Sequence, residues 1–398
     1  MTGPAVTGPF ALGAALAGRE QADLLRRRIA THGSVAGRLQ VDGRDYLNFS
    51  ANDYLGLADH SAIKAAFKAG IERYGAGSGA SPLVTGYSRA HQELEDTLAE
   101  WLGVEAVLLF NCGFSANQAV LKALLGKEHL LWQDKLNHAS LQEMGSQLPC
   151  KMKRFAHNDM AALERQLEPN RGLIVSEGVF SMDGDQAPWG ELAALAARSG
   201  NWLMIDDAHG LGVLGSEGRG TLAAQGVPPA SVHIQMGTFG KALGVAGAFV
   251  GGSRELVEYL VNFARHYVYS THMPAAQACA VSKSIELVRA ADESRAHLGQ
   301  LIARFRQGAK DQGWQLGASD TPIQPLLVGE SSVALQLAER LRERGVWVSA
   351  IRPPTVPVGT ARLRITLSAA HREQDVDRLL DALGVCPAVT TLGEVHHG

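Results

Sequence analysis

The sequence predicts an α/β protein with a large, mostly parallel sheet covered by helices on both faces, followed by a smaller α+β domain. From about residue 90 onward, short runs that are apolar throughout alternate with helical patterns. Strands buried on both faces need such runs, and parallel strands need a helical crossover between them. A chain of 398 residues is also long for one hydrophobic core, so a second domain is expected.

This alternation predicts the individual elements in order. A helix is predicted over residues 19–31, and a hairpin over residues 35–49 turns at Asp42-Gly43. The predicted strands are 106–110, 130–132, 173–176, 202–205 and 232–236. The predicted helices are 91–101, 115–125, 161–167, 192–198 and one long helix from Pro274 to Leu301 and beyond. The predicted domains are a 1–50 segment that packs with the small domain, a large domain at 51–291 and a small domain at 292–398.

Composition and charge argue against several classes of protein. The net charge is −3, and the densest basic cluster, Arg26–Arg28, is too small for a nucleic-acid footprint. The four cysteines are scattered without the spacing of a zinc site or a disulfide framework. We therefore expect reduced thiols, no metal and no nucleic-acid partner.

The first 18 residues are uncharged and fairly apolar, so a signal peptide has to be considered. No basic segment precedes the apolar stretch, and Gly8-Pro9 interrupts it, which argues against secretion. No later apolar run approaches the roughly 20 residues that span a bilayer. We therefore expect a cytoplasmic enzyme with no membrane partner.

Two short motifs that follow predicted strands indicate pyridoxal 5'-phosphate chemistry. Asp206 opens Asp-Asp-Ala-His-Gly, and Lys241 closes Thr-Phe-Gly-Lys. A lysine amine forms an imine with the cofactor aldehyde, while a carboxylate keeps the pyridine nitrogen protonated. Small or apolar neighbours of Lys241 favour the desolvation that lowers an amine pKa. Each motif alone also fits a surface lysine or a capping aspartate, and Asp207 is the alternative ring partner.

Other candidates follow further strand ends, where ligands bind in parallel sheets. Asp206, Glu177, Gly113 and Lys241 all lie just past strand-like runs, so one cleft is expected to hold them. Gly113 opens a helix whose free amides suit a phosphate.

Three more polar groups are candidates for the same cleft. The Thr238 hydroxyl is a second phosphate ligand candidate. His138 suits either a ring stacked on the pyridine or a hydrogen-bonded core position. Ser181 and His209 are candidates for the ring hydroxyl of the cofactor.

Arginines in the second domain are candidates for binding an amino-acid carboxylate, which an arginine fork grips at two points. Arg352 lies in Ile-Arg-Pro-Pro-Thr-Val-Pro, and strand alternation places Arg362 and Arg364 on one face. The glycine-rich segment 75–81 lacks the GxGxxG spacing and a preceding strand, so a dinucleotide fold is disfavoured. This segment fits an entrance loop or a simple turn.

Together these motifs resemble the α-oxoamine synthase family of fold-type I pyridoxal phosphate enzymes, over residues 20–385. The combination is specific, although the individual segments are not. The segments that carry the resemblance are 52–56, 180–185, 206–210, 238–241 and 351–357.

The resemblance implies a role for each matching residue. Lys241 forms the imine, Asp206 pairs with the pyridine, and His138 stacks on the ring. Further cofactor contacts are implied for Gly113, Phe114, Ser181, His209 and Thr238. Thr271 resembles a residue given across a dimer interface to the neighbouring phosphate. Substrate contacts are implied for Arg26, His138, Thr355 and, at the amino-acid carboxylate, Arg364.

The activity implied is that of a homodimeric acyltransferase in biotin biosynthesis. It condenses L-alanine with a pimeloyl thioester, on coenzyme A or acyl carrier protein, and releases carbon dioxide. The alternatives are a family member that uses glycine or serine, an aminotransferase on the same fold, and a catalytically silent binding protein. The sequence does not choose between the two thioester carriers.

Overall fold

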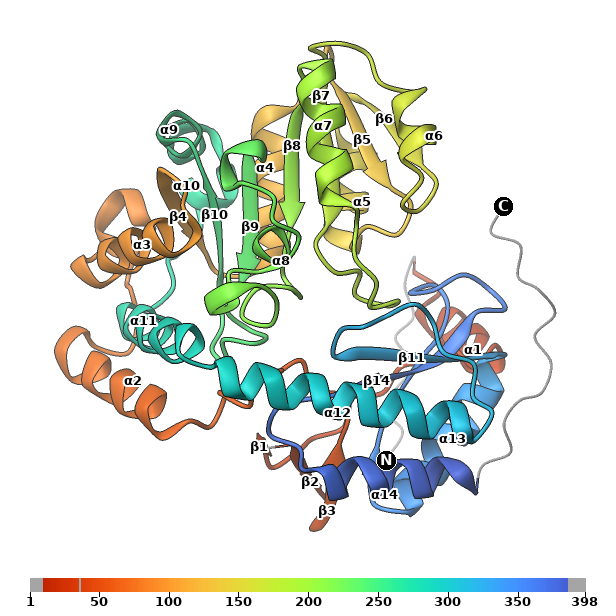
Figure 1. The fold of residues 1–398 in the computed structure, drawn as a ribbon. Helices are drawn as coiled ribbons and strands as arrows, with labels where there is room; N and C mark the ends of the chain where they lie inside the picture. The colour runs from red at the N-terminus through yellow and green to blue at the C-terminus, as the bar shows by residue number, and fades with distance from the viewer. Residues whose placement is uncertain (1–9, 36, 386–398) are drawn as a thin grey trace.

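A seven-stranded sheet in the order β4-β10-β9-β8-β7-β5-β6 forms the centre of the molecule (Figure 1). The computed structural model describes residues 10–35 and 37–385. β10 runs antiparallel to both of its neighbours, and the remaining pairs are parallel. The prediction of a mostly parallel sheet is therefore confirmed. The strands are β4 (Ala106–Phe110), β5 (Leu130–Asp134), β6 (Lys151–Phe155), β7 (Gly172–Glu177), β8 (Trp202–Asp206), β9 (Ile234–Thr238) and β10 (Ala248–Gly252).

Both faces of this sheet are covered, which explains why its inner strands are apolar throughout. In β8, Met204 belongs to one core cluster, whereas Leu203 and Ile205 belong to another on the opposite face. The first cluster includes side chains of α4 (Gly113–Leu124), α5 (Ala139–Gln147), α9 (Arg254–Phe263) and α10 (Arg265–Val268). The second includes side chains of α6 (Met160–Glu164), α7 (Trp189–Ser199) and α8 (Thr221–Ala224).

Two smaller sheets lie below the large one in Figure 1. One has the order β1-β2-β3-β12, with β1 (Ser34–Val35), β2 (Arg38–Val41), β3 (Arg44–Asn48) and β12 (Val346–Trp347). The other has the order β11-β14-β13, with β11 (Ile323–Gly329), β13 (Ser349–Ile351) and β14 (Ala361–Thr366). β3 pairs in parallel with β12, so the N-terminal segment packs against the C-terminal part of the chain. Our domain limits at residues 50 and 291 remain a proposal.

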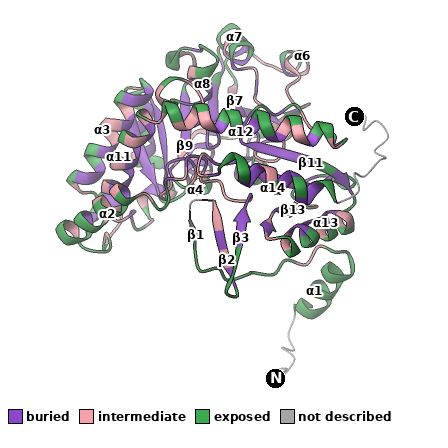
Figure 2. Ribbon diagram, turned by 60° about the horizontal axis from the view of Figure 1, so that its bottom comes forward, coloured by how far each residue is buried: buried purple, intermediate pink, exposed green. Residues whose placement is uncertain are grey.

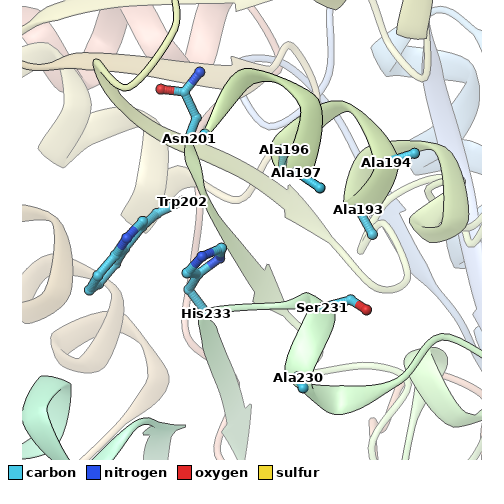
Figure 3. A pocket seen from close by; sticks show the side chains of 10 residues that line it. Ala193, Ala194, Ala196, Ala197, Asn201, Trp202, Ala230, Ser231 and His233 are labelled. Carbon is cyan, nitrogen blue, oxygen red and sulfur yellow. The ribbon is translucent and has the colours of Figure 1, made fainter.

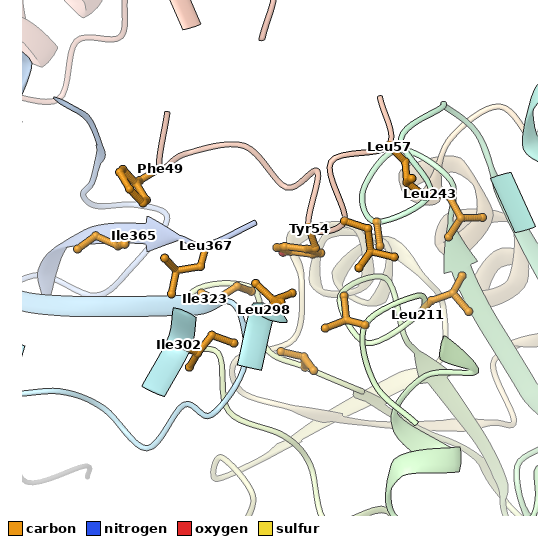
Figure 4. Close-up of a cluster of buried hydrophobic side chains, with 14 of the residues drawn as sticks. Phe49, Tyr54, Leu57, Leu211, Leu243, Leu298, Ile302, Ile323, Ile365 and Leu367 are labelled. Atoms are coloured by element: carbon orange, nitrogen blue, oxygen red, sulfur yellow. The ribbon is translucent and has the colours of Figure 1, made fainter. Parts of the chain in front are cut away.

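A third core cluster joins the loops of the large sheet to the small sheets (Figure 4). In this view Leu211 and Leu243 lie toward one end of the cluster, Ile365 lies toward the other, and Tyr54 and Ile323 lie between them. Helices α2 (Ser61–Tyr74), α3 (Arg89–Leu102), α11 (Ala275–Arg289), α12 (Asp292–Asp311), α13 (Ser331–Glu343) and α14 (Glu373–Gly384) also contribute to it. This continuous apolar packing holds the two groups of strands in one arrangement.

Two helix predictions are wrong. The first helix is α1 (Leu12–Gln21), which has no buried residue and stands apart from the small sheets in Figure 2. The chain leaves helical geometry at Asp23, which has a φ of 55°. The predicted long helix is instead α11 followed by α12. Arg295 donates to the Val288 carbonyl at 2.7 Å, which satisfies the end of α11, and Asp292 and Glu293 suit the start of α12.

The hairpin prediction is confirmed, because Asp42 and Gly43 both have the positive φ that a tight two-residue turn requires. β6 and β10 were not predicted. β6 is an edge strand with mostly exposed or half-buried residues, so it lacks an apolar pattern. Within residues 10–35 and 37–385, no helix is long and apolar enough to cross a membrane.

Candidate active site

The predicted site residues gather where the parallel strands end. Asp206 is the last residue of β8 and is paired in register with Glu177, the last residue of β7. Thr238 ends the next strand, β9, and Lys241 follows it in the loop. This arrangement results from parallel strands sharing one carboxyl edge, with short loops that carry the polar side chains.

Asp206 is buried and held by two donors. The residue is only 4% exposed. Asn117 on α4 donates through Nδ2 to Oδ2 at 2.7 Å, and the Ala208 amide donates to Oδ1 at 3.1 Å. The carboxylate is therefore fixed in direction at the strand end, as a partner for a cationic ring nitrogen must be.

Asp207 has a different role. The Thr221 amide and hydroxyl donate to its two carboxyl oxygens at 2.8 and 2.6 Å. Burial raises the pKa of Asp207 to about 7, although the bonds from Thr221 act in the opposite direction. Because both oxygens are engaged by Thr221, the geometry favours Asp206 over Asp207 as the group that faces a cofactor.

Lys241 begins a chain of hydrogen-bonded side chains. Its Nζ lies 2.7 Å from His209 Nε2, and His209 Nδ1 lies 2.5 Å from the Tyr54 hydroxyl. Tyr54 in turn donates to Asn52 Oδ1 at 3.3 Å. Burial, with the Lys241 charge second, holds the pKa of His209 well below its usual range, so the ring is neutral. We assign Lys241 as donor to Nε2 and the Nδ1–H group as donor to Tyr54.

The environment of Lys241 favours an uncharged amine. Burial lowers its pKa to about 8, while the charges of Asp206 and Glu177 resist this change. Glu177 is itself buried, and burial, followed by the Asp206 charge, raises its pKa well above the usual range. Glu177 and His209 beside the amine are thus held neutral, while the Arg364 charge further favours the free amine.

His138 caps the N-terminus of α5 through its side chain. Its Nδ1 accepts from the Ser140 hydroxyl at 2.8 Å, and Ser140 Oγ accepts from Asn117 at 2.9 Å. Asn117 therefore connects His138 to Asp206. Burial lowers the His138 pKa, an effect that Asp206 opposes and Lys241 supports. The neutral ring then carries its proton on Nε2, with Phe114 edge-on at 6.4 Å between centroids.

Groups suited to a phosphate lie at the start of α4. Gly113 is the first residue of this helix, so the amides of the first turn have no partner within it. An added Cβ at Gly113 would lie 3.9 Å from the Thr238 Cβ, which places the helix start beside the end of β9. The Thr238 hydroxyl donates to the Gly247 carbonyl at 2.9 Å. Thr271 is exposed, and its carbonyl accepts from Asn111 at 2.8 Å, two residues before Gly113.

The arginine predicted to bind a carboxylate enters from β14. Arg364 is buried and donates from Nε to the Ser181 carbonyl at 2.7 Å. Its Nη1 donates to Asn52 and Thr366 at 3.1 and 3.0 Å. Its Nη2 takes part in none of these three bonds and is the open arm of the fork, with the Tyr54 side chain as a further neighbour of Arg364. Arg362 is committed to Asp183 at 2.5 Å.

Three other predicted residues lie at the edge of this group. Arg26 donates to the Thr355 hydroxyl at 2.9 Å, which joins two predicted substrate contacts that are far apart in sequence. Arg352 donates to the Asp23 carbonyl. Within the parts of the chain that the structure describes, no hydrogen bond links Arg26 or Thr355 to the Lys241 network.

Sequence reasoning gave no role to several residues that build the site. Tyr54 and Asn52 lie in a segment that was noted as turn-rich, and Ser140 lies two residues after His138. Asn117 completes this set, whereas Glu177 was expected in the cleft because it follows a strand-like run. For Asn117 the sequence carries no signal, because an asparagine inside a helix acquires its two partners only through packing.

A surface pocket of about 560 Å³ lies at the opposite end of β8 (Figure 3). It is lined by alanines of α7 and by Trp202, whose ring stacks on His233 at 5.3 Å. Trp202 begins the strand that Asp206 ends, so this pocket is separate from the candidate active site.

The part of the chain that the structure describes has no group of three or more His, Cys, Asp or Glu side chains suited to a metal. The residues present instead fit pyridoxal 5'-phosphate. A lysine amine, a fixed carboxylate and a helix start rich in free amides match its aldehyde, ring nitrogen and phosphate. The same lysine amine and backbone amides are donors and would not bind a metal ion.

Comparisons with known proteins identify the family to which the chain belongs. Residues 44–383 match the family model for aminotransferase class I and II. A solved serine palmitoyltransferase from Sphingomonas wittichii has 29% identity and a TM-score of 0.90, covering 95% of this chain and 98% of that one. A solved structure of SPT with PLP has 27% identity and a TM-score of 0.88, covering 94% and 96%.

The chain therefore belongs to the aminotransferase class I and II family, whose fold is that of the fold-type I pyridoxal phosphate enzymes. Within this family its similarity is more specific. It is 87% identical to the 8-amino-7-oxononanoate synthase of Aeromonas salmonicida, over 100% of both chains.

Proposed function

We propose that this protein is a pyridoxal 5'-phosphate-dependent acyltransferase that makes 8-amino-7-oxononanoate in biotin biosynthesis. It condenses L-alanine with a pimeloyl thioester and releases carbon dioxide and the free carrier. The observation that carries the proposal is the half-buried Lys241 amine, which His209 binds at 2.7 Å and on which the charges of Asp206 and Arg364 act. The 87% identity to a named 8-amino-7-oxononanoate synthase supports the choice of substrates.

The residues that would hold the cofactor are Lys241, Asp206, His138 and the start of α4 at Gly113. Thr238 and Phe114 would lie on the phosphate side, and Ser181 and His209 on the ring side. When bound, pyridoxal 5'-phosphate supplies an electron sink for a carbanion next to the amino-acid nitrogen. Asp206 serves this chemistry because a fixed carboxylate keeps the ring nitrogen protonated.

Lys241 has the properties of the group that moves the substrate proton. Its pKa of about 8 leaves more free amine at neutral pH than an exposed lysine has. His209 accepts a hydrogen bond from this amine and, being neutral, does not repel its charged form. Lys241 is therefore suited to take the proton from alanine Cα, a transfer typically worth about 10²- to 10⁴-fold in rate.

Arg364 and His138 are suited to orient the substrates. The open arm of Arg364 would bind the alanine carboxylate, and its other donors are fixed by Ser181 and Asn52. The Nε2–H group of His138 would donate to an acyl or carboxylate oxygen. Arg26 and Thr355 would contact the acyl chain at the edge of the site.

We extend the proposal to a homodimer in the cytoplasm, with coenzyme A or acyl carrier protein as the thioester carrier. Thr271 would reach the phosphate of the neighbouring subunit. Its exposure, and that of Tyr269 at 71%, fits a surface that a second copy covers.

An absorbance titration of the purified protein tests the proposal. L-Alanine should shift the cofactor band at lower concentration than glycine or L-serine, and adding pimeloyl thioester should release carbon dioxide. A preference for serine would favour the activity named for the solved neighbours. Formation of pyridoxamine phosphate without carbon dioxide would indicate an aminotransferase, and a colourless protein would indicate a silent binding protein.

A further inference from the structure

The loop between β7 and α7, residues 178–188, supports both arginines of β14. Its Ser181 carbonyl accepts from Arg364 Nε at 2.7 Å. Its Met182 carbonyl and Asp183 carboxylate accept from Arg362 at 3.2 and 2.5 Å. The loop also carries the Ser181 hydroxyl, a candidate cofactor contact. The position of the loop therefore determines where both this hydroxyl and the Arg364 guanidinium lie.

His157 links this loop to the end of β5. Its Nδ1 lies 3.0 Å from Asp134 Oδ1, and its Nε2 lies 2.7 Å from Asp185 Oδ2. Asp134 ends β5, whereas Asp185 belongs to the loop. With an acceptor at each ring nitrogen, both nitrogens must donate, so the ring is an imidazolium that joins two carboxylates. Its ring packs perpendicular to that of Phe180, with 4.4 Å between centroids and 87° between planes.

The loop depends on His157 at Asp185. Among the described residues, the Asp185 carboxylate has two side-chain partners, His157 and Asn158. Asn158 also donates through its backbone amide to Asp134 at 2.9 Å, so it bridges the same two carboxylates as His157. Without the cation, Asp134 and Asp185 would be two facing carboxylates in a largely buried place, and their repulsion would push the loop outward.

We propose that His157 is a positioning residue for the amino-acid substrate: by joining Asp134 to Asp185 as a cation, it fixes the 178–188 loop against β14 and sets the direction of Arg364. His157 itself would contact neither substrate nor cofactor. The thioester would be unaffected, because its predicted contacts, Arg26 and Thr355, lie outside this chain of interactions.

The charge state of His157 agrees with this role. Burial lowers its pKa, but the hydrogen bonds and charges of Asp134 and Asp185 outweigh burial and raise it to about 10. A pKa above the unfolded value of about 6.5 means that the stabilisation is complete below pH 6.5 and declines as pH rises toward 10. The anchor is therefore intact at neutral pH.

His157→Gln tests the inference in the holoenzyme, with His129→Gln as the matched control. His129 lies at the other end of β5 and also approaches one carboxylate, that of Glu128, at 3.5 Å. We expect KM for L-alanine to rise about 10- to 100-fold in His157→Gln, because small misplacements of a binding group cost up to roughly 100-fold. KM for the pimeloyl thioester should change by less than about 2-fold, and His129→Gln should match the parent in both.

Two readouts need no substrate, so they separate this inference from the proposed function on which it rests. Hydrogen exchange at the Gly184 amide, which bonds the Phe180 carbonyl at 2.8 Å, should be faster in His157→Gln. Nitrogen NMR of the parent should show an imidazolium signal at pH 8 that is missing in His157→Gln. Asp185→Asn should reproduce the exchange result if His157→Gln does not fold.

Three results would overturn the inference. The first is an unchanged KM for alanine with unchanged loop exchange. The second is an equal loss for alanine and thioester, which indicates a general structural defect. The third is a neutral His157 ring at pH 8. A protein that lacks alanine activity but shows the exchange and NMR results would contradict the proposed function and leave the loop anchor supported.

Discussion

At the scale of single residues, several titratable groups near the Lys241 amine and the Asp206 carboxylate are held in their neutral forms. His209 and Glu177 are buried, and their pKa values, like that of His138, are shifted toward the neutral forms. An amine beside neutral groups gains little basicity from ion pairing, so desolvation dominates and lowers its pKa. This explains why the Lys241 pKa is lowered although acids lie near it.

Lys241→Ala should remove both the covalent anchor and the proton-transfer group. We expect turnover to fall by at least about 10²- to 10⁴-fold, and the cofactor to be lost on gel filtration. Steady-state rates and the absorbance spectrum measure the two effects. Lys64→Ala, at an exposed surface ion pair, is the control and should match the parent. Substantial turnover with a retained imine band would refute the role of Lys241.

At the scale of elements, the strand ends approach one another so closely that three glycines are needed around Asp207. An added Cβ at Gly178, Gly210 or Gly220 would lie 2.0, 2.2 or 2.0 Å from a carboxyl oxygen of Asp207. The buried Asp207–Thr221 pair thus fills the space behind Asp206 and ties α8 to the end of β8. Of the two consecutive acids in the sequence, Asp207 supports the fold and Asp206 faces the site.

Gly210→Ala should therefore destabilise the protein. Forcing a methyl group into this space should cost about 1–3 kcal/mol of the free energy of unfolding. Gly190→Ala is the matched control, because an added Cβ in α7 meets nothing within 4 Å and alanine favours helix. Urea denaturation of both variants measures the difference. Equal stability of the two variants would show that the space around Asp207 can expand.

At the scale of the whole molecule, His371 ties the N-terminal segment to the small domain. Its Nε2 donates to the Asn48 carbonyl at 3.0 Å, while Nδ1 accepts from the Ser368 amide at 3.1 Å. Its ring stacks on Phe49, with 4.3 Å between centroids. Burial lowers the His371 pKa to about 4, so the folded protein holds this ring neutral.

The pH dependence of stability follows from this shift. With a folded pKa below the unfolded value of about 6.5, the stabilisation is complete above pH 6.5 and declines as pH falls toward 4. The loss at pH 4 is on the order of 3 kcal/mol from His371 alone. Denaturation at pH 7 and pH 4.5 should show this loss, and His371→Gln should reduce the difference between the two pH values. An unchanged pH difference in the variant would mean that other groups dominate.

The sequence by itself determined the fold class and indicated the candidate reacting groups. Apolar runs at a regular spacing require a sheet buried on both faces, and Lys241 and Asp206 occupy strand ends whatever the details of packing. These features depend on local sequence, because a strand and the loop that follows it are neighbours in the chain.

Tertiary structure alone decided the partners that give those groups their properties. Tyr54, Asn117 and Arg364 come from distant segments, and their hydrogen bonds form only when the sheets and helices pack together. The break between α11 and α12 could not be predicted either, because it depends on the hydrogen bond from Arg295 to the Val288 carbonyl. Burial, which sets the pKa values of the site, is likewise a property of the packed molecule and not of any one segment.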